Sequence, residues 1–447
     1  MSKLEVVYLP IGVGTFHLES AQKLFEDSIK LLKKIFPDVK YPRDMLLELD
    51  KLRDFTSDLN PSLLIVQNIT FANAAYMNEI MRTFRNCDVL LWTLREPVID
   101  GGRLRLNSLT GAYSAANSMH NFGCENFQYV YGSPEEIHVY QSLKSTIKAA
   151  TVKQDLKNLR IASVGHTPEG FGFGQALDSE LLNTFGVTQI SVEARELMQK
   201  ANSYVSGDYE NTYQEADSKL KNLYETKQEN MDAFIRLYKA YEDFVDENNI
   251  GAIASRCWPD YFTEYGTPVC AVLGMLNDKL KIASCETDIY GALSMYIGSK
   301  LTDSPTFFGD PVSLSEDENT ITFWHCGTAA CSLAHPAKGA ELGVHPNRKI
   351  GPTMEFGVKP VEKATVFRVG RRPDGSFRFF VTSGSVLDKP KQFSGTSLVF
   401  KTAGSAKEII HASVQDGWEP HFAIVYEDVI KELKILADML DLDIYIY

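Results

Sequence analysis

Apolar runs alternate with helical patterns over much of the chain, and this alternation constrains the fold more than any other feature. The clearest runs are Glu5–Val13, Ser62–Asn68, Asp88–Leu94 and Arg160–Gly165. Runs of this kind are typical of strands that are buried on both faces, as in parallel sheets covered by helices. The alternation therefore predicts an α/β fold with two doubly wound, Rossmann-like domains.

The pattern changes after about residue 305. Residues 358–386 alternate apolar and polar side chains around the turn Arg372–Gly375, and another short strand follows at Ser397–Phe400. Short strands separated by turn residues predict a small antiparallel β-barrel-like domain. We predict an N-terminal α/β domain at 1–155, a second one carrying Glu286 at 156–305, and a β-rich domain with a terminal helix at 306–447. Charged residues 208–248 predict two solvated helices without chemistry.

Composition narrows the classes of function. The net charge of the 447-residue chain is −13, which argues against binding to nucleic acid or to an anionic membrane surface. The start of the chain enters a strand pattern directly and no apolar run has membrane-spanning length, so we expect a cytoplasmic protein. Seven cysteines without C-x-x-C spacing predict buried free thiols rather than disulfides or a zinc site.

A glycine-rich loop, Gly165–Gly174, follows one of the apolar runs. It resembles a phosphate-binding loop but lacks the Walker lysine and the dinucleotide spacing, which argues against ATP and NAD. We interpret it as a loop at the substrate side or at a subunit interface.

Four polar side chains in the second half of the chain are candidates for chemistry. Glu286 lies where a strand passes into a helix, Asp310 follows an aromatic pair, and His325 and His421 lie within or before apolar strands. Asp288 is better explained as the N-cap of the helix that follows. Each position taken singly has an ordinary structural explanation, but carboxylates and imidazoles combine in this way around Mn²⁺, Fe²⁺ or Co²⁺.

The segments around these residues resemble those of a known enzyme family. Cys285-Glu286-Thr287-Asp288, Phe308-Gly309-Asp310 and Arg256-Cys257-Trp258 are similar to segments of L-fucose isomerase, and the order of acids and histidines also resembles L-arabinose isomerase. The resemblance implies that Glu286, Asp310 and His421 bind a divalent metal, with His325 as a fourth ligand or close neighbour. Mn²⁺ is the expected ion, with Co²⁺ and Fe²⁺ as alternatives. It also implies homo-oligomers with sites near subunit interfaces.

By this resemblance the protein is an aldose–ketose isomerase that works through a cis-enediol(ate), with Glu286 and Asp310 as the acid/base pair. Arg256, Trp258, His325 and Asn107 are the candidate substrate-binding residues. A metal-dependent sugar epimerase or aldolase and a non-catalytic sugar-binding module remain as alternatives.

Fucose- and arabinose-type sugars are the default substrates that the resemblance implies. A hexose with another C6 substituent also fits, including a sulfonated one such as sulfoquinovose. Arginines expected near the site, namely Arg256, Arg103, Arg105 and Arg348, would accommodate an anionic sugar.

Overall fold

The computed structural model describes residues 3–447, and the chain divides into two compact units. The first unit extends to Asp155 and includes Lys431–Asp441, whereas the second comprises Leu156–Ile430 and Leu442–Tyr447. Across residues 3–447, every helix is too short or too polar to cross a membrane.

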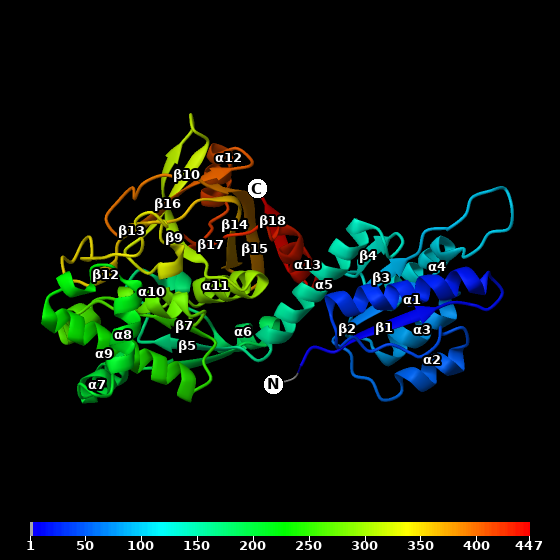
Figure 1. Ribbon diagram of the computed structural model, residues 1–447, viewed down its shortest axis with the longest axis horizontal. Helices are drawn as coiled ribbons and strands as arrows, with labels where there is room; N and C mark the ends of the chain where they lie inside the picture. The colour runs from blue at the N-terminus through cyan, green and yellow to red at the C-terminus, as the bar shows by residue number, and fades with distance from the viewer. Residues whose placement is uncertain (1–2) are drawn as a thin grey trace. The chain divides into compact units, whose positions relative to one another are not determined.

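The first unit is built on a parallel sheet with the order β1-β2-β3-β4 (Figure 1). The strands are β1 (Val6–Ile11), β2 (Leu63–Asn68), β3 (Asp88–Thr93) and β4 (Gln128–Tyr131). The helices are α1 (Leu18–Ile35), α2 (Leu49–Thr56), α3 (Ala74–Thr83), α4 (Ser108–Asn121), α5 (Ile137–Leu156) and α13 (Ile430–Leu440).

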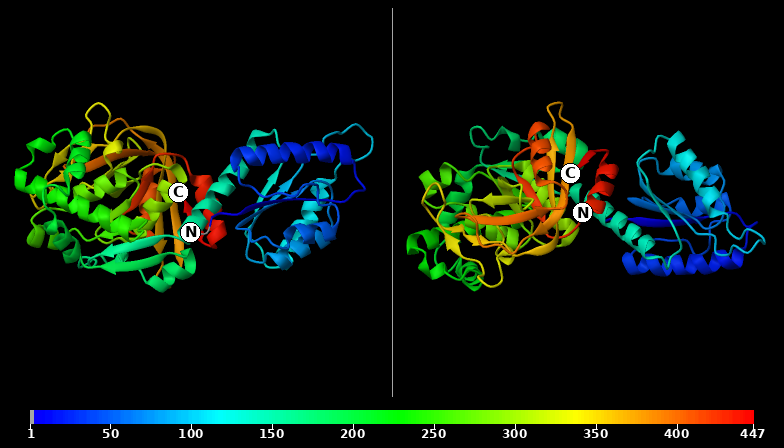
Figure 2. Two further views of the ribbon diagram at one scale, coloured as in Figure 1. Left: turned by 60° about the horizontal axis from the view of Figure 1, so that its bottom comes forward. Right: turned by 90° about the horizontal axis from the view of Figure 1, so that it is seen from above.

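Helices cover both faces of this sheet, as both views of Figure 2 show. On β1, Tyr8 faces α1 and stacks on Phe25 at 6.2 Å between ring centroids. The neighbouring Val7 and Leu9 belong to the opposite cluster, which includes Met77 of α3. Because alternate side chains of one strand are buried on opposite faces, the run must be apolar throughout.

The second unit begins with another parallel sheet, in the order β6-β5-β7-β8. Its strands are β5 (Arg160–Val164), β6 (Thr188–Val192), β7 (Ala252–Ser255) and β8 (Ile282–Cys285). Its helices are α6 (Asp178–Phe185), α7 (Ala194–Ser203), α8 (Glu210–Lys219), α9 (Gln228–Glu247), α10 (Cys270–Asp278) and α11 (Ile289–Thr302).

Six antiparallel strands of the second unit close into a barrel, in the order β16-β10-β9-β17-β14-β15 and back to β16. They are β9 (Phe307–Ser315), β10 (Thr320–His325), β14 (Val361–Arg371), β15 (Phe377–Val386), β16 (Thr396–Thr402) and β17 (Phe422–Val425). Two further strands extend the barrel sheet: β13 (Phe356–Gly357) pairs with β16, and β18 (Asp443–Ile446) pairs with β15. A separate two-stranded sheet consists of β11 (Leu342–Gly343) and β12 (Thr353–Met354). Helix α12 (Ala406–Gln415) precedes β17. These parallel sheets and this barrel confirm the predicted mixed α/β class.

The β-barrel closes at a glycine of β15. Gly384 of β15 lies opposite Thr402 of β16, and a Cβ at position 384 would come within 2.1 Å of the carbonyl oxygen of Lys401. Only glycine allows the two strands to approach this closely.

Helix α11 joins the parallel sheet of the second unit to its barrel (Figure 1). It contacts β7 and β8 on one side and β14 and β17 on the other, and nearly all of its residues are buried. A helix that is apolar on all sides is stable only inside a core. The residue before it, Asp288, is therefore held deep in the protein.

One prediction about the outer helices is wrong. Residues 208–248 do form two helices, but α9 is not solvated. Phe234, Leu237, Tyr238 and Tyr241 are fully buried, and the helix contacts α7 and α10. Its apolar side chains recur at helical spacing among the charged ones, and this periodicity identifies a core-facing helix more reliably than the density of charge.

Candidate active site

Glu286 sits on a strained turn at the carboxyl end of the second parallel sheet. Both Glu286 (φ 58°) and Thr287 (φ 57°) adopt the left-handed conformation between β8 and α11. Each non-glycine residue in this region costs roughly 1–2 kcal/mol, and the β-branched Thr287 is the more unusual of the two. The Thr287 N–H donates to the Ser255 carbonyl at 3.2 Å, which holds the turn against β7. Strain maintained in this way is typical of functional sites.

Asp288 caps α11 and also organises the side chains around it. Its Oδ1 accepts a hydrogen bond from the Gly291 N–H at 2.8 Å, which confirms the predicted N-cap. The same carboxylate pairs with Arg368 of β14 through contacts of 2.6 and 3.0 Å, and both side chains are fully buried. Its Oδ2 lies 2.9 Å from Nδ1 of His421. Asp288 therefore fixes the orientation of the His421 ring, so that the other ring nitrogen, Nε2, faces away from Asp288.

Four strands bring the four candidate side chains together. Glu286 follows β8, Asp310 lies in β9 opposite Trp324 of β10, and His325 ends β10. His421 comes directly before β17, which pairs with β9. The barrel thus supplies one acid and both histidines, and the sheet supplies the other acid.

The distances show how closely they converge. Nε2 of His421 lies 3.0 Å from Oε2 of Glu286 and 3.2 Å from Oδ1 of Asp310. Nε2 of His325 lies 4.0 Å from the same oxygen of Glu286. The ligand atoms of Glu286, His325 and His421 all lie within 4.8 Å of one another. All four side chains are mostly or fully buried, with Asp310 the most exposed at 27%.

Their pKa values show that this cluster stabilises positive charge. Burial lowers the pKa of His421, but hydrogen bonds to Asp288 and Glu286 outweigh burial and raise it to about 10. Burial also lowers the pKa of His325, yet Cys326 and the nearby carboxylates raise it to about 9. A group of acids that favours two cationic imidazoles would also favour a cation placed between them.

The two acids respond differently to the same surroundings. Burial raises the pKa of Glu286, but the hydrogen bond from His421 and the charges of both histidines leave it below its ordinary value. Burial likewise raises the pKa of Asp310, and there the histidines do not compensate, so the pKa stays above its ordinary value.

The residues fit a divalent ion. Within residues 3–447, Oδ1 of Asp310 is buried without a hydrogen-bond partner, although Nε2 of His421 is near. A buried carboxylate oxygen without a partner is costly unless a cation or water completes the site. Imidazole and carboxylate ligands suit Mn²⁺, Fe²⁺ and Co²⁺, and the Asp288–His421 pair is the kind of outer contact that fixes a metal-binding imidazole.

A cavity of about 230 Å³ opens beside the cluster. Its lining comprises Phe171, Trp258, Glu286, Asp310, Trp324, His325, Cys326, His345, Asn347 and Arg348. Phe171 comes from the glycine-rich loop, so that loop does lie at the cavity. A Cβ on Gly174 of this loop would lie 2.9 Å from Cα of Asp288, so the loop packs directly on the turn that carries Glu286.

The predicted substrate-binding residues lie in different places. Trp258 and His325 line the cavity. The Arg256 guanidinium is held in its own turn, where Nε lies 3.1 Å from both the Trp258 carbonyl and Asp260. Asn107 belongs to the first unit, where it precedes α4 with φ 57° and its Oδ1 accepts from the Thr110 hydroxyl at 2.7 Å.

Sequence reasoning missed Arg368 and the aromatic rings around His421. Arg368 lies in a strand that also contains other charged residues, and only its complete burial marks it as the partner of an acid. Phe173 and Phe308 contact the His421 ring at centroid distances of 5.3 and 4.8 Å. An arginine placed directly between Phe367 and Val369 is the one signal that could have revealed this pair.

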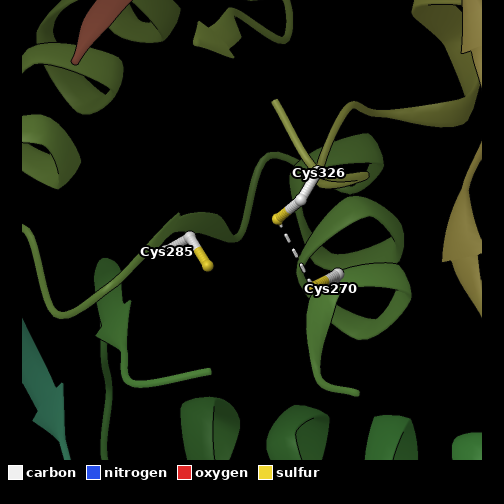
Figure 3. A group of neighbouring side chains, drawn as sticks. All are labelled: Cys270, Cys285 and Cys326. Atoms are coloured by element: carbon white, nitrogen blue, oxygen red, sulfur yellow. Dashed lines mark hydrogen bonds between the residues drawn. The ribbon is translucent and has the colours of Figure 1, made fainter. Parts of the chain in front are cut away.

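Three thiols form a separate group of neighbouring side chains (Figure 3). Cys270, Cys285 and Cys326 are buried, and the sulfur atoms of Cys270 and Cys326 are 3.7 Å apart. All seven cysteines are free, as the composition predicts. Cys285 and Cys326 are the chain neighbours of Glu286 and His325, so two of the three thiols are adjacent in sequence to candidate site residues.

Two acids and two imidazoles beside a cavity define a candidate centre of the kind that metal-dependent enzymes use. No family model matches the chain. It is 60% identical to the sulfoquinovose isomerase of Clostridium sp. (strain MSTE9) over the full length of both proteins. It is 35% identical to that of Priestia aryabhattai over both full lengths, and 33% identical to that of Alkalicoccus urumqiensis over 99% of each chain. The chain belongs to the sulfoquinovose isomerase family, which confirms the prediction of a sugar isomerase.

Proposed function

We propose that this protein is an aldose–ketose isomerase that interconverts sulfoquinovose and its ketose, sulfofructose. The observation that carries the proposal is the convergence of Glu286, Asp310, His325 and His421 beside one cavity, in a chain 60% identical to a sulfoquinovose isomerase. Moving a carbonyl from C1 to C2 requires a proton to leave C2 and return to C1, and paired acids suit that task.

We also propose that Glu286, Asp310 and His421 hold a divalent ion, with His325 as a fourth ligand or close neighbour. Mn²⁺ is the proposed ion, with Co²⁺ and Fe²⁺ as alternatives. When bound, such an ion stabilises negative charge that develops on the two sugar oxygens at C1 and C2. The unsatisfied oxygen of Asp310 and the fixed ring of His421 support this assignment.

In this mechanism the chain's own residues handle the proton. One carboxylate of the Glu286–Asp310 pair takes the proton from C2, and the other, in its acid form, donates a different proton to C1. The sugar passes through a cis-enediol(ate), the hydroxyl proton of O2 passes to O1, and the pair ends with the proton on the opposite member. Asp288 keeps His421 in position through its contact with Nδ1. Trp258 and His325 line the cavity and would contact the sugar, whereas Arg256 acts on the turn that presents Trp258.

The likeness to L-fucose and L-arabinose isomerases supports a further part of the proposal. Enzymes of that kind would form homo-oligomers in which the N-terminal part of one subunit covers the site of another. We propose the same arrangement here, with Asn107 as a substrate contact from a neighbouring subunit. The molecular mass of the protein in solution tests the homo-oligomer. The KM of N107A tests Asn107 as a substrate contact.

NMR in D₂O tests the central proposal. Purified protein is incubated with sulfoquinovose after chelation with EDTA, with and without added Mn²⁺. We expect Mn²⁺-dependent appearance of a ketose with the same number of carbon atoms and with deuterium on carbon. Shorter carbon chains would indicate an aldolase, an epimeric aldose would indicate an epimerase, and binding without turnover would indicate a sugar-binding module. Any of these three outcomes would overturn the proposal.

A further inference from the structure

Arg348 is the arginine in the wall of the cavity. It shares the lining with Glu286, Asp310, His325 and Trp258. In the part of the chain that the structure describes, Arg348 forms no ion pair with a carboxylate. The chain as a whole is acidic, with a net charge of −13. An unpaired cation in a cavity of such a protein attracts an anionic group that the surrounding charge would otherwise repel.

Aromatic rings hold the Arg348 guanidinium in place and leave its donors available. Its Cζ lies 5.2 Å from the centre of the Trp258 ring and 6.0 Å from that of Phe262. Cation–π contact of this kind uses the face of the guanidinium, whereas its N–H groups lie at the edge. The edge can therefore form two parallel hydrogen bonds to one anion.

Hydrogen bonds within the loop that carries Arg348 hold the loop together. Nδ1 of His345 accepts hydrogen bonds from the N–H groups of Asn347 and Arg348, both at 3.3 Å. The His345 N–H donates to the Ile350 carbonyl at 2.9 Å, and the ring packs edge-on against Phe262 at 5.0 Å. The backbone at Arg348 is thus held by its own loop, and the residue itself is exposed and lines the cavity.

Trp258 links this arginine to the acid cluster. One face of its ring carries the Arg348 guanidinium, and the same residue lines the cavity together with Glu286 and Asp310. The cationic and acidic parts of the cavity therefore share one lining. An anionic group on a sugar is repelled by the carboxylates and attracted by Arg348, so it would set which end of the sugar faces the acids.

We propose that Arg348 binds the C6 sulfonate of the substrate and thereby determines both its orientation and the preference for a sulfonated sugar. This assignment rests on the proposed function. Of the other arginines noted in the sequence, Arg256 pairs with Asp260, and Arg103 and Arg105 do not line this cavity. A sulfonate carries three acceptor oxygens and one negative charge, which match the paired donors of a guanidinium.

Kinetics with two sugars test the assignment. Sulfoquinovose and 6-deoxyglucose differ only in the sulfonate. We expect R348Q to lower kcat/KM for sulfoquinovose on the order of 10- to 100-fold, chiefly through KM, because a charged hydrogen-bond pair is lost. Turnover of 6-deoxyglucose should stay within about twofold. R348K should fall between, because it keeps the charge and loses the planar pair.

Lys349 supplies the matched control. It is the next residue of the same loop and carries the same charge, but it lines a different hollow together with Gly343 and Ile350. K349Q should leave both sugars unaffected. As a readout without turnover, ethanesulfonate should inhibit the wild-type protein competitively and inhibit R348Q at least tenfold more weakly.

The outcomes distinguish a failure of the proposed function from a failure of the role of Arg348. A wild-type protein that does not isomerise sulfoquinovose would refute the proposed function and this assignment with it. Wild-type turnover together with an unchanged sugar preference in R348Q, or an equal effect of K349Q, would refute the role of Arg348 alone.

Discussion

Replacing Asp288 by asparagine should destabilise the second unit strongly while leaving the shape of the site almost unchanged. Asparagine keeps the size of the side chain and an oxygen that can accept from the Gly291 N–H. It removes the charge opposite Arg368, whose side chain is fully buried and receives its two carboxylate contacts at 2.6 and 3.0 Å from Asp288 alone. Leaving one partner of such a pair without its counter-charge costs about 3–5 kcal/mol.

Urea unfolding followed by tryptophan fluorescence measures this cost. Three of the four tryptophans, Trp258, Trp324 and Trp418, lie in the second unit, so their emission reports mainly on that unit. With a slope of about 3 kcal/mol per M, the midpoint should fall by about 1 M or more. Turnover should also fall by about 10- to 100-fold, because the ring of His421 loses the carboxylate that orients it.

An exposed ion pair in the same unit provides the control. Arg195 and Glu264 form an equally well aligned pair at 2.7 and 2.9 Å on the surface, so E264Q should leave the midpoint almost unchanged. The double variant D288N/R368M should be more stable than D288N, because the unpaired charge is gone. A midpoint for D288N that matches E264Q, or a double variant that is less stable than D288N, would refute the reasoning.

Three further changes test the site and the first unit. E286Q should lower turnover by at least about 1,000-fold with an unchanged circular dichroism spectrum, and near-normal activity would remove Glu286 from the mechanism. G174A should reduce activity more than tenfold because its Cβ would meet backbone atoms of residues 287–288 at 2.9 and 3.2 Å, whereas G172A, which meets nothing within 4 Å, should not. E136Q should lower thermal stability modestly at neutral pH, because a hydrogen bond from an arginine side chain and one from the backbone lower the pKa of Glu136 to about 2. Since a lowered carboxyl pKa contributes stability above the unfolded value, the difference should shrink as the pH falls from about 4 towards 2, and a difference independent of pH would contradict the assignment.

Much of the fold could be predicted because burial on both faces leaves a local signature. The runs at residues 6–11 and 63–68 are buried at every position and almost wholly apolar, since each strand lies between two layers of helices. The turn at Arg372–Gly375 likewise places β14 and β15 side by side as a hairpin. Helix α9 was misjudged because its charged face dominates the composition, although its apolar face is what determines the packing.

The candidate site could be predicted only as separate parts. Glu286, Asp310 and His421 are distant along the chain, and the pairing of β17 with β9 is what brings the last two together. Sequence periodicity shows that a segment is a strand but does not show which strand it pairs with, because many pairings bury equal apolar area. The resemblance to known isomerases supplied the missing link between these residues.

The amino-acid sequence by itself determined the class of fold, the chemical nature of the candidate ligands and the cap at the start of α11, since each depends on local pattern or side-chain chemistry. The tertiary structure decided which charges meet. It buried Arg368 against Asp288, turned Nε2 of His421 towards two acids, and left Arg348 unpaired on a tryptophan in the cavity wall. Electrostatic interactions depend on distance and burial in three dimensions, which no spacing along the chain specifies.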